Sequence, residues 1–287
     1  MTRSTRFARA LATSALVTLL VPTAVVSQPA RTPRPAANTP TVDMAALAKA
    51  PTVARAMAAL QAENEWTLGQ QIALCEIPAP PFKEAARADA YRKQLISLGA
   101  SNVRIDQEGN VLGEIHGAAP GPTVMLSSHL DTVFPEGTNV KVKREGTKLT
   151  APGIGDDCRG LAVTLAITRQ IITNNIPIAG RLLIVATVGE EGPGNLRGVR
   201  AIFGSAMRDS LDYFISVDGV GYSITNRAVG SNRYRVKYSG PGGHSYGAFG
   251  MPNPIHALGR AIALASDLPL SLIHISEPTR LRRISYA

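Results

Sequence analysis

The chain has 287 residues, of which 45% are hydrophobic and 18% are charged, and its formal net charge is +9. This length can hold a full-sized hydrophobic core, and the composition is typical of a globular protein and excludes a largely disordered one. The basic balance does not indicate a nucleic-acid partner, because the arginines are scattered along the chain, and we expect no nucleic-acid binding. Two cysteines, Cys75 and Cys158, allow one disulfide at most, and their spacing does not say whether they meet.

The first 42 residues have the pattern of a leader followed by a linker. Residues 1–27 contain three early arginines, an apolar stretch and then small residues, which predicts a signal peptide and export to the periplasm or the medium. The apolar stretch is short and contains Pro22, so a membrane anchor is the alternative and we expect no stable membrane span after cleavage. Residues 28–42 contain four prolines and no apolar period, which predicts an extended linker.

Helical and β-prone segments alternate over residues 43–229. Apolar residues at helical spacing predict helices over 43–75, 82–98, 159–175 and 198–207. Short β-prone runs predict strands over 102–107, 110–117, 122–129, 181–189 and 211–219, and the last two are apolar enough to be buried. This alternation predicts an α/β fold in which a mostly parallel central sheet is flanked by helices.

The pattern changes after residue 229. Residues 233–243 alternate between polar and apolar types, which predicts an exposed strand, and residues 253–268 have the spacing of a helix packed on it. We therefore predict one domain over 43–229 and the start of a smaller α+β domain over 230–269.

Polar side chains gather where each predicted core strand is followed by a loop. They are His129, Asp131, Asp156, Asp157, Glu190, Glu191 and Asp218. The carboxyl ends of parallel strands converge on one crevice, which is the usual place for a ligand site. Carboxylates crowded there would repel one another, and this would raise their pKa values unless a cation kept them ionised. The pattern therefore predicts a cluster of divalent metal ions. Imidazole and carboxylate ligands suit zinc and also accept manganese or cobalt.

Five motifs, taken in order, carry a family resemblance. They are SSHLDTV, APGIGDDCRGLAV, TVGEEGPGNLRGVR, ISVDG and SGPGGHSYGAFGMPNPIHAL. In this set the chain resembles the dinuclear zinc metallopeptidases that include aminoacylase, carboxypeptidase G, succinyl-diaminopimelate desuccinylase and tripeptidase T. The resemblance implies that residues 43–229 are a zinc-peptidase catalytic domain and that residue 230 begins a lid or dimerisation domain.

The resemblance also implies a role for each residue of the cluster. The implied metal ligands of a two-zinc centre are His129 and Asp218 on one ion, Asp157 as the bridge, and Glu191 on the second ion. Glu190 would be the general base and Asp131 would orient His129. Asp157 is preferred to Asp156 because Asp157-Cys158-Arg159-Gly160 fits the family's order of aspartate, any residue, basic residue and glycine.

His244, in the motif GPGGHSYG, is the implied donor to the oxyanion that forms during hydrolysis. In this family the lid histidine often comes from the partner subunit, so the resemblance implies a homodimer for the full-length protein. The alternative for His244 is a turn histidine that is hydrogen-bonded locally.

The chain departs from the family in its last ligand. The family has a second histidine late in the chain, and the only later histidine here is His274, within LSLIHISEPTRLRRISYA. That tail resembles the translation of a transposase-type sequencing adapter, so we expect residues 270–287 to be non-native and the native sequence to stop near Pro269. The second metal site is then incomplete in this chain, and we expect the chain as written to hydrolyse little; the alternative is that His274 replaces the missing ligand.

The sequence therefore predicts a zinc-dependent hydrolase that cleaves an amide bond in short peptides or N-acyl amino acids, with tripeptidase-like action favoured over carboxypeptidase-like action. The alternative is a periplasmic metal or solute-binding protein without catalysis, in which a free base beside the ligands would have no use. A nucleotide-dependent enzyme is disfavoured because Gly153-x-Gly155 is not followed by the third glycine of the dinucleotide fingerprint.

Overall fold

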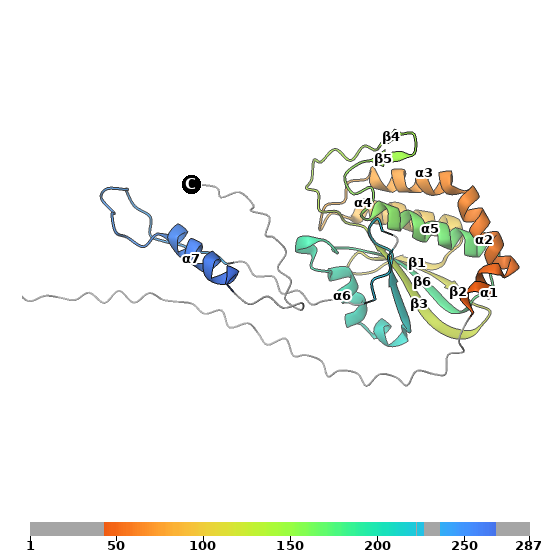
Figure 1. Cartoon of the computed structure of the whole chain (residues 1–287). Helices are drawn as coiled ribbons and strands as arrows, with labels where there is room; N and C mark the ends of the chain where they lie inside the picture. Colours follow the sequence, from red (N-terminus) through yellow and green to blue (C-terminus); the bar gives the residue numbers. More distant parts are fainter. Residues whose placement is uncertain (1–42, 222, 227–235, 268–287) are drawn as a thin grey trace, which may run out of the picture.

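The computed structural model describes residues 43–221, 223–226 and 236–267 (Figure 1). The predicted signal peptide and linker, residues 1–42, and the predicted tail, residues 270–287, lie outside the described residues. None of the helices in the described ranges combines the length and the hydropathy that crossing a membrane requires.

Helices form the first part of the described chain, as the apolar spacing predicts. They are α1 (Met44–Lys49), α2 (Pro51–Ala62), α3 (Asn64–Cys75) and α4 (Ala85–Leu98). Local chemistry sets their ends: the Asp43 side chain accepts the first free N–H groups of α1, and Pro51 occupies the first position of α2. Gly99 stops α4 because it adopts the left-handed conformation, with φ of 91°.

A five-stranded sheet forms the centre of the molecule, in the order β1-β2-β6-β3-β7. Its strands are β1 (Ser101–Ile105), β2 (Val111–His116), β3 (Ala119–His129), β6 (Ala179–Thr187) and β7 (Tyr213–Ser216). β3 pairs in parallel with both β6 and β7, and β2 pairs antiparallel with β1 and β6, so β2 alone among these five strands runs against the rest. The predicted fold, a mostly parallel sheet flanked by helices, is confirmed. A separate hairpin, β4 (Lys143–Glu145) with β5 (Lys148–Thr150), has no counterpart among the predicted strands.

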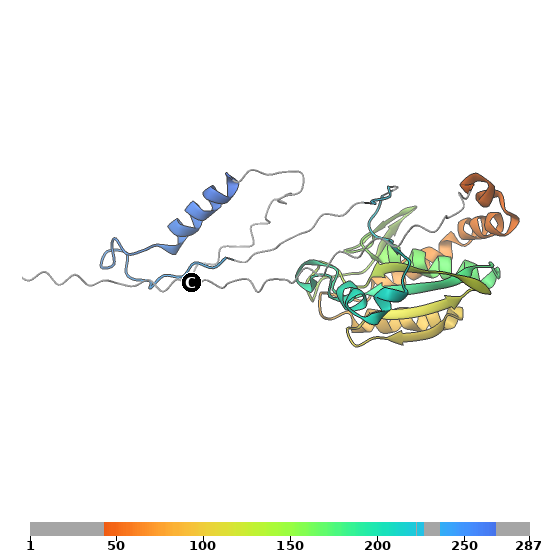
Figure 2. The same ribbon diagram turned by 90° about the horizontal axis from the view of Figure 1, so that it is seen from below.

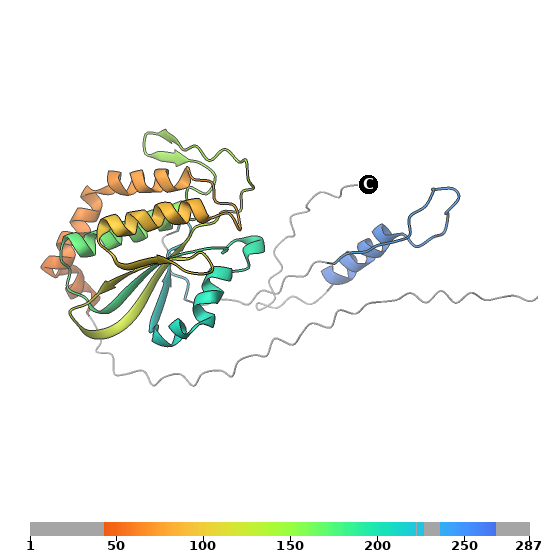
Figure 3. The same cartoon turned by 180° about the vertical axis from the view of Figure 1, so that it is seen from behind.

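Helices cover both faces of the sheet (Figures 1 and 3). On one face, α3, α4 and α5 (Cys158–Thr173) pack on Ile184 and Ala186 of β6. On the other face, α6 (Arg197–Gly204) and the 3₁₀ helix η2 (Ala206–Ser210) pack on Leu183 and Val185 of the same strand. Alternate residues of β6 thus belong to opposite cores, and this is why the strand is apolar on both faces over residues 182–186.

β7 differs from its prediction as a buried strand. It pairs with β3 alone among the described strands, and all of its residues are exposed, with Tyr213 at 54% and Ile215 at 50%. Phe214 still makes an edge-to-face contact with Phe203 of α6, with the ring centroids 5.5 Å apart. The apolar sequence of 211–219 was therefore a correct sign of a strand but not of its burial.

The last described segment, residues 236–267, contains α7 (Pro254–Ser266) and no buried residue. α7 occurs where the helix was predicted, whereas residues 236–243, the described part of the predicted strand 233–243, are not in a strand. A strand needs a hydrogen-bonded neighbour, and the described residues provide none for this segment. Figure 2 shows α7 apart from the sheet and from the helices that cover it.

Candidate metal centre

The polar residues that follow the strands meet at one edge of the sheet. His129 ends β3 and lies beside Thr187, the last residue of β6, in the parallel register. β7 is in register on the other side of β3, so the loops after all three strands leave from the same edge. These loops carry Asp131, Glu190, Glu191 and Asp218, as the sequence analysis expects.

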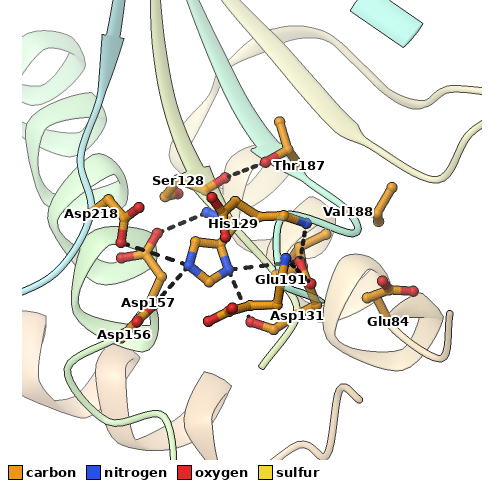
Figure 4. A network of polar contacts seen from close by, with 12 residues as sticks. Glu84, Ser128, His129, Asp131, Asp156, Asp157, Thr187, Val188, Glu191 and Asp218 are labelled. Carbon is orange, nitrogen blue, oxygen red and sulfur yellow. Dashed lines mark hydrogen bonds and ion pairs between the residues drawn. The ribbon is translucent and has the colours of Figure 1, made fainter. Parts of the chain in front are cut away.

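The imidazole of His129 lies at the centre of this cluster and is buried (Figure 4). Its Nε2 is 2.8 Å from Oδ1 of Asp156 and 3.7 Å from Oδ1 of Asp218. Its Nδ1 is 2.9 Å from the backbone carbonyl oxygen of Asp131, which it faces as a hydrogen-bond donor. The carbonyl therefore orients the ring and leaves Nε2 directed at the carboxylates.

Asp157 is buried and is held by two backbone groups from different elements. Its Oδ2 accepts the N–H of His129 at 2.8 Å, and its Oδ1 accepts the N–H of Gly160 at 3.0 Å as the N-cap of α5. A cis peptide bond joins Asp157 to Asp156, whose carboxylate is more exposed.

Asp131 has a larger role than its prediction as the orienter of His129. Its carboxylate is fully buried and accepts the backbone N–H groups of Glu190 at 3.0 Å and Glu191 at 2.9 Å. The same carboxylate is 3.7 Å from Nδ1 of His129, further than the backbone carbonyl of Asp131 itself. Asp131 therefore joins the loop after β3 to the loop after β6, and its backbone and side chain orient different parts of the site.

Two groups of side chains are close enough to hold a metal ion. One comprises His129, Asp157 and Asp218, and the other comprises His129, Asp156 and Glu191, with the candidate ligand atoms of each group within 4.8 Å of one another. The structure thus brings three of the predicted ligands together and places the fourth, Glu191, with Asp156. From the sequence, Asp157 was preferred to Asp156 as a metal ligand, whereas the structure places both in candidate ligand groups.

The charges of the cluster fit a bound cation. Burial raises the pKa of Asp157 to about 8, and the negative charge of Asp218 adds to this effect. Burial also raises the pKa values of Glu190 and Glu191, and the carboxylates around them raise both further. Burial lowers the pKa of His129, but its contacts with the carboxylates of Asp131, Asp156 and Asp218 outweigh this effect, and the net shift is well upward. A divalent cation would relieve the same repulsion, and one imidazole with carboxylates is a donor set that zinc, manganese and cobalt accept.

Comparison with known proteins identifies the family of the chain. The model of the family described as peptidase family M20/M25/M40 matches residues 125–282, which is more than half of the chain. The chain belongs to peptidase family M20/M25/M40. The matched range includes residues 270–282, and the assignment of those residues to an adapter-derived tail stays a prediction.

Two curated proteins are similar to the chain at low identity. Carboxypeptidase G2 of Pseudomonas sp. (strain RS-16) is 26% identical over 220 residues, which cover 70% of this chain and 49% of that protein. The uncharacterised protein YqjE of Bacillus subtilis (strain 168) is 30% identical over 193 residues, 62% of this chain and 50% of that protein. The chain therefore spans about half the length of the curated relatives it matches.

Two solved structures share the fold of the chain. The dipeptidase Dug1p of Saccharomyces cerevisiae aligns with a TM-score of 0.55 at 14% identity, over 73% of this chain and 52% of its own. Human carnosine dipeptidase 1 aligns with a TM-score of 0.51 at 13% identity, over 59% and 42%. At these identities the alignments show a shared fold alone.

An ion pair that was not predicted from the sequence lies beside the candidate metal centre. Arg197, the first residue of α6, makes a bidentate pair with Glu84, with Nη1 to Oε1 at 3.0 Å and Nη2 to Oε2 at 2.9 Å. Its guanidinium also lies 3.1 Å from Oε1 of Glu108 and 4.8 Å from the ring centroid of Phe82. A methyl group added at Gly189 would come within 2.0 Å of Nη1 of Arg197, so the loop that leads to Glu190 lies directly against this side chain. The only sign of this in the sequence is the arginine in NLRG.

His244, the predicted oxyanion donor, is exposed and hydrogen-bonded locally. Its Nδ1 accepts the backbone N–H of Tyr246 at 3.3 Å and that of Gly247 at 3.5 Å. Among the described residues, no polar contact joins His244 to the cluster around His129, so the structure does not bring this predicted site residue to the other ones. The local bonds agree with the alternative of a turn histidine.

Proposed function

We propose that this chain carries the metal-binding half of the active site of a hydrolase that cleaves amide bonds in short peptides or N-acyl amino acids, and we favour tripeptidase-like action. The observation that carries the proposal is the pair of ligand groups around His129 at the carboxyl edge of a sheet in an M20 chain. Glu190, next to one of these ligands, supplies the additional carboxylate that a hydrolase needs as a base.

The metal would be held by His129, Asp157 and Asp218, with Asp156 and Glu191 on the second side. When bound, a pair of divalent ions would lower the pKa of a water molecule and polarise the carbonyl that this water attacks. His129 belongs to both groups, but Nδ1 faces the carbonyl of Asp131, which leaves one ring nitrogen for one ion. Neither group contains a second histidine, so we expect these residues to fill the coordination of one zinc ion and only part of that of a second.

Glu190 acts as the proton carrier in this proposal. Burial and the neighbouring carboxylates raise its pKa, which brings a carboxylate nearer to the pH at which it both accepts and releases a proton. Its carboxylate takes the proton from the attacking water, and the same proton then passes to the nitrogen of the leaving amine. Asp131 fixes the backbone of Glu190 and Glu191 through two hydrogen bonds, so both carboxylates start from a defined position.

His244 as the donor to the oxyanion, a homodimer that supplies it across subunits, and export directed by residues 1–27 belong to the same proposal. They are supported by the motif GPGGHSYG and by the N-terminal pattern of the sequence. Zinc is the metal that we propose, with manganese and cobalt as substitutes of suitable chemistry.

Metal binding can be tested on this chain by equilibrium dialysis against zinc, followed by elemental analysis. We expect about one zinc ion per chain, and His129→Ala should weaken binding more than about 100-fold because it removes a ligand from both groups. His116→Ala, an exposed histidine on β2, is the matched control and should bind as the parent does. Asp156→Asn and Asp218→Asn, compared with each other, identify the group that binds first. Unchanged zinc affinity in a folded His129→Ala variant would refute the site.

Turnover is tested on the protein expressed from its genomic gene, with dipeptides, tripeptides and N-acyl amino acids as substrates and with or without a chelator. Glu190→Gln should lower kcat by about 10² to 10⁴-fold while the metal content stays that of the parent. Activity that survives chelation or this substitution would contradict the mechanism. Zinc binding without turnover of any of these substrates would instead support a metal or solute-binding protein.

A further inference from the structure

Cys75 and Cys158 are far apart in the sequence but are brought together where α3 packs on α5. Cys75 is the last residue of α3, Cys158 is the first residue of α5, and both thiols are free and fully buried. Arg159, the residue after Cys158, donates to the side chain of Gln71, one turn before Cys75, at 3.3 Å. The Cys75 thiol and the Cys158 N–H donate to the adjacent carbonyls of Pro152 and Gly153, at 3.6 and 3.2 Å. Figures 1 and 3 show the two helices side by side on the same face of the sheet. The proposed hydrolysis gives neither thiol a role.

We propose that Cys75 and Cys158 form a disulfide that ties the end of α3 to the beginning of α5. These shared contacts place the two cysteines at the facing ends of packed helices, and the bond forms when their side chains turn toward each other. Both sulfurs are buried, so neither reaches a cysteine of another molecule while the chain is folded. They are the only two cysteines of the chain, so no other internal pairing competes.

The surroundings of Cys75 favour the first step of such a reaction. The neighbouring Cys158 lowers the pKa of the Cys75 thiol, and the Arg87 cation lowers it further, while burial opposes both. Arg87 is itself fully buried, and its Nη2 lies 3.3 Å from the carbonyl oxygen of Cys75. Because the thiolate is the nucleophile in disulfide exchange, Cys75 is the expected attacking group.

A small-molecule disulfide such as oxidised glutathione serves as the oxidant. The Cys75 thiolate attacks one sulfur of glutathione disulfide, the disulfide bond of the reagent breaks, and one glutathione leaves as its thiolate. Cys158, after its proton passes to solvent, attacks the Cys75 sulfur of this mixed disulfide and releases the second glutathione. Two electrons thus pass from the protein to the reagent, and two glutathione thiols are formed. Since both sulfurs are buried in the folded chain, we expect this exchange to occur during folding, before α3 and α5 are fully packed on each other.

The link would act on the loop that carries Asp156 and Asp157. α3 already holds this loop through the amide of Gln71, which donates to the carbonyl of Ile154 at 2.7 Å. The Cys75 thiol adds a weaker bond to the carbonyl of Pro152 at 3.6 Å. A disulfide would add a covalent connection from α3 to Cys158, the residue that directly follows this loop. The proposal of the disulfide does not depend on the proposed function.

The test equilibrates the whole chain in glutathione buffers of increasing oxidising strength, with and without concentrated guanidinium chloride, and measures the intact mass after quenching. We expect the loss of two hydrogens and an unreduced tryptic peptide pair that contains Cys75 and Cys158. Because folding holds the sulfurs together, the concentration ratio of oxidised to reduced glutathione that half-oxidises the protein should be at least about 100-fold lower in buffer than in denaturant. Equal midpoints in the two solvents, or two free thiols in buffer with excess oxidised glutathione, would overturn the proposal.

The variants Cys75→Ser and Cys158→Ser are the controls. Each should show no loss of two hydrogens under any of these conditions, since a single thiol can form only a mixed disulfide. The oxidised parent should unfold about 10 °C above its reduced form, because a disulfide that closes a long loop restricts the unfolded chain. The serine variants should show no such redox-dependent difference. A lower Tm for the oxidised parent would mean that the folded helices resist the bond, and this would overturn the proposal.

Discussion

Arg197 contacts the loop that carries Glu190 and Glu191, and removing its charge tests how much its ion pairs stabilise the fold around this loop. In Arg197→Met the aliphatic part of the side chain stays, but the bidentate pair with Glu84 and the contact with Glu108 are lost. Within the described part of the chain, the Glu84 carboxylate then keeps only its bond from the N–H of Phe82, at 3.1 Å.

The burial of the two partners sets the magnitude. The side chain of Glu84 is 3% exposed and that of Arg197 is 20% exposed. Removing one partner of a buried pair costs about 3–5 kcal/mol because the other charge is left unpaired, and the partial exposure of Arg197 places the cost at about 3 kcal/mol. For a folded region of this size, that cost lowers the Tm by about 6–12 °C. Glu84→Gln in the same chain removes the unpaired charge, so the double variant should recover about 2 kcal/mol.

Thermal unfolding by calorimetry and guanidinium titration measures both variants against the parent. Arg144→Met is the matched control, because Arg144 makes a bidentate pair with Glu65 at 2.8 Å for both bonds, but with side chains that are 43% and 71% exposed. We expect no measurable change of Tm in this control. The reasoning would be refuted if Arg197→Met were as harmless as Arg144→Met, or if the double variant were no more stable than the single one.

Two further substitutions test the packing around the site. Gly189→Ala should destabilise the chain more than Gly137→Ala in chemical denaturation. Both glycines have positive φ (63° and 83°), but among the described residues only Gly189 has a neighbour, Arg197, in the way of a methyl group. Gly137→Ala therefore measures the backbone cost alone, about 1 kcal/mol, and equal losses of stability in the two variants would show that the contact with Arg197 is unimportant. Tyr91→Phe removes the hydroxyl that hydrogen-bonds Oγ1 of Thr164 at 2.7 Å in the core, so we expect a loss of about 1–2 kcal/mol by the same method, and a neutral result would count against that bond.

Much of the fold followed from local chemistry that is visible in the sequence. Pro51 and Gly99 fix helix ends through properties that act within a few residues, so the helical segments could be predicted closely. The convergence of His129, Asp157 and Asp218 was also predictable, because parallel strands place their carboxyl ends at the same edge whatever the details of the loops.

The remaining features depend on neighbours that a sequence does not display. The apolar residues of β7 indicate a strand, but the burial of a strand depends on what lies beside it. Asp156 and Asp157 are adjacent and chemically equal, and only the path of the turn decides that Asp157 caps α5 while Asp156 faces His129. The pair of Arg197 with Glu84 joins positions more than one hundred residues apart, and no local pattern announces it.

The two backbone hydrogen bonds of Asp157 have a consequence for how ions exchange. One bond comes from the end of β3 and the other from the first turn of α5, so folding alone fixes the position of this carboxylate. The conformational entropy of ordering it is lost when the chain folds, and an arriving ion does not have to bear that cost. Ions should therefore enter and leave without unfolding their surroundings, and the choice among zinc, manganese and cobalt should depend on availability and coordination preference more than on the order in which the chain folds and is loaded.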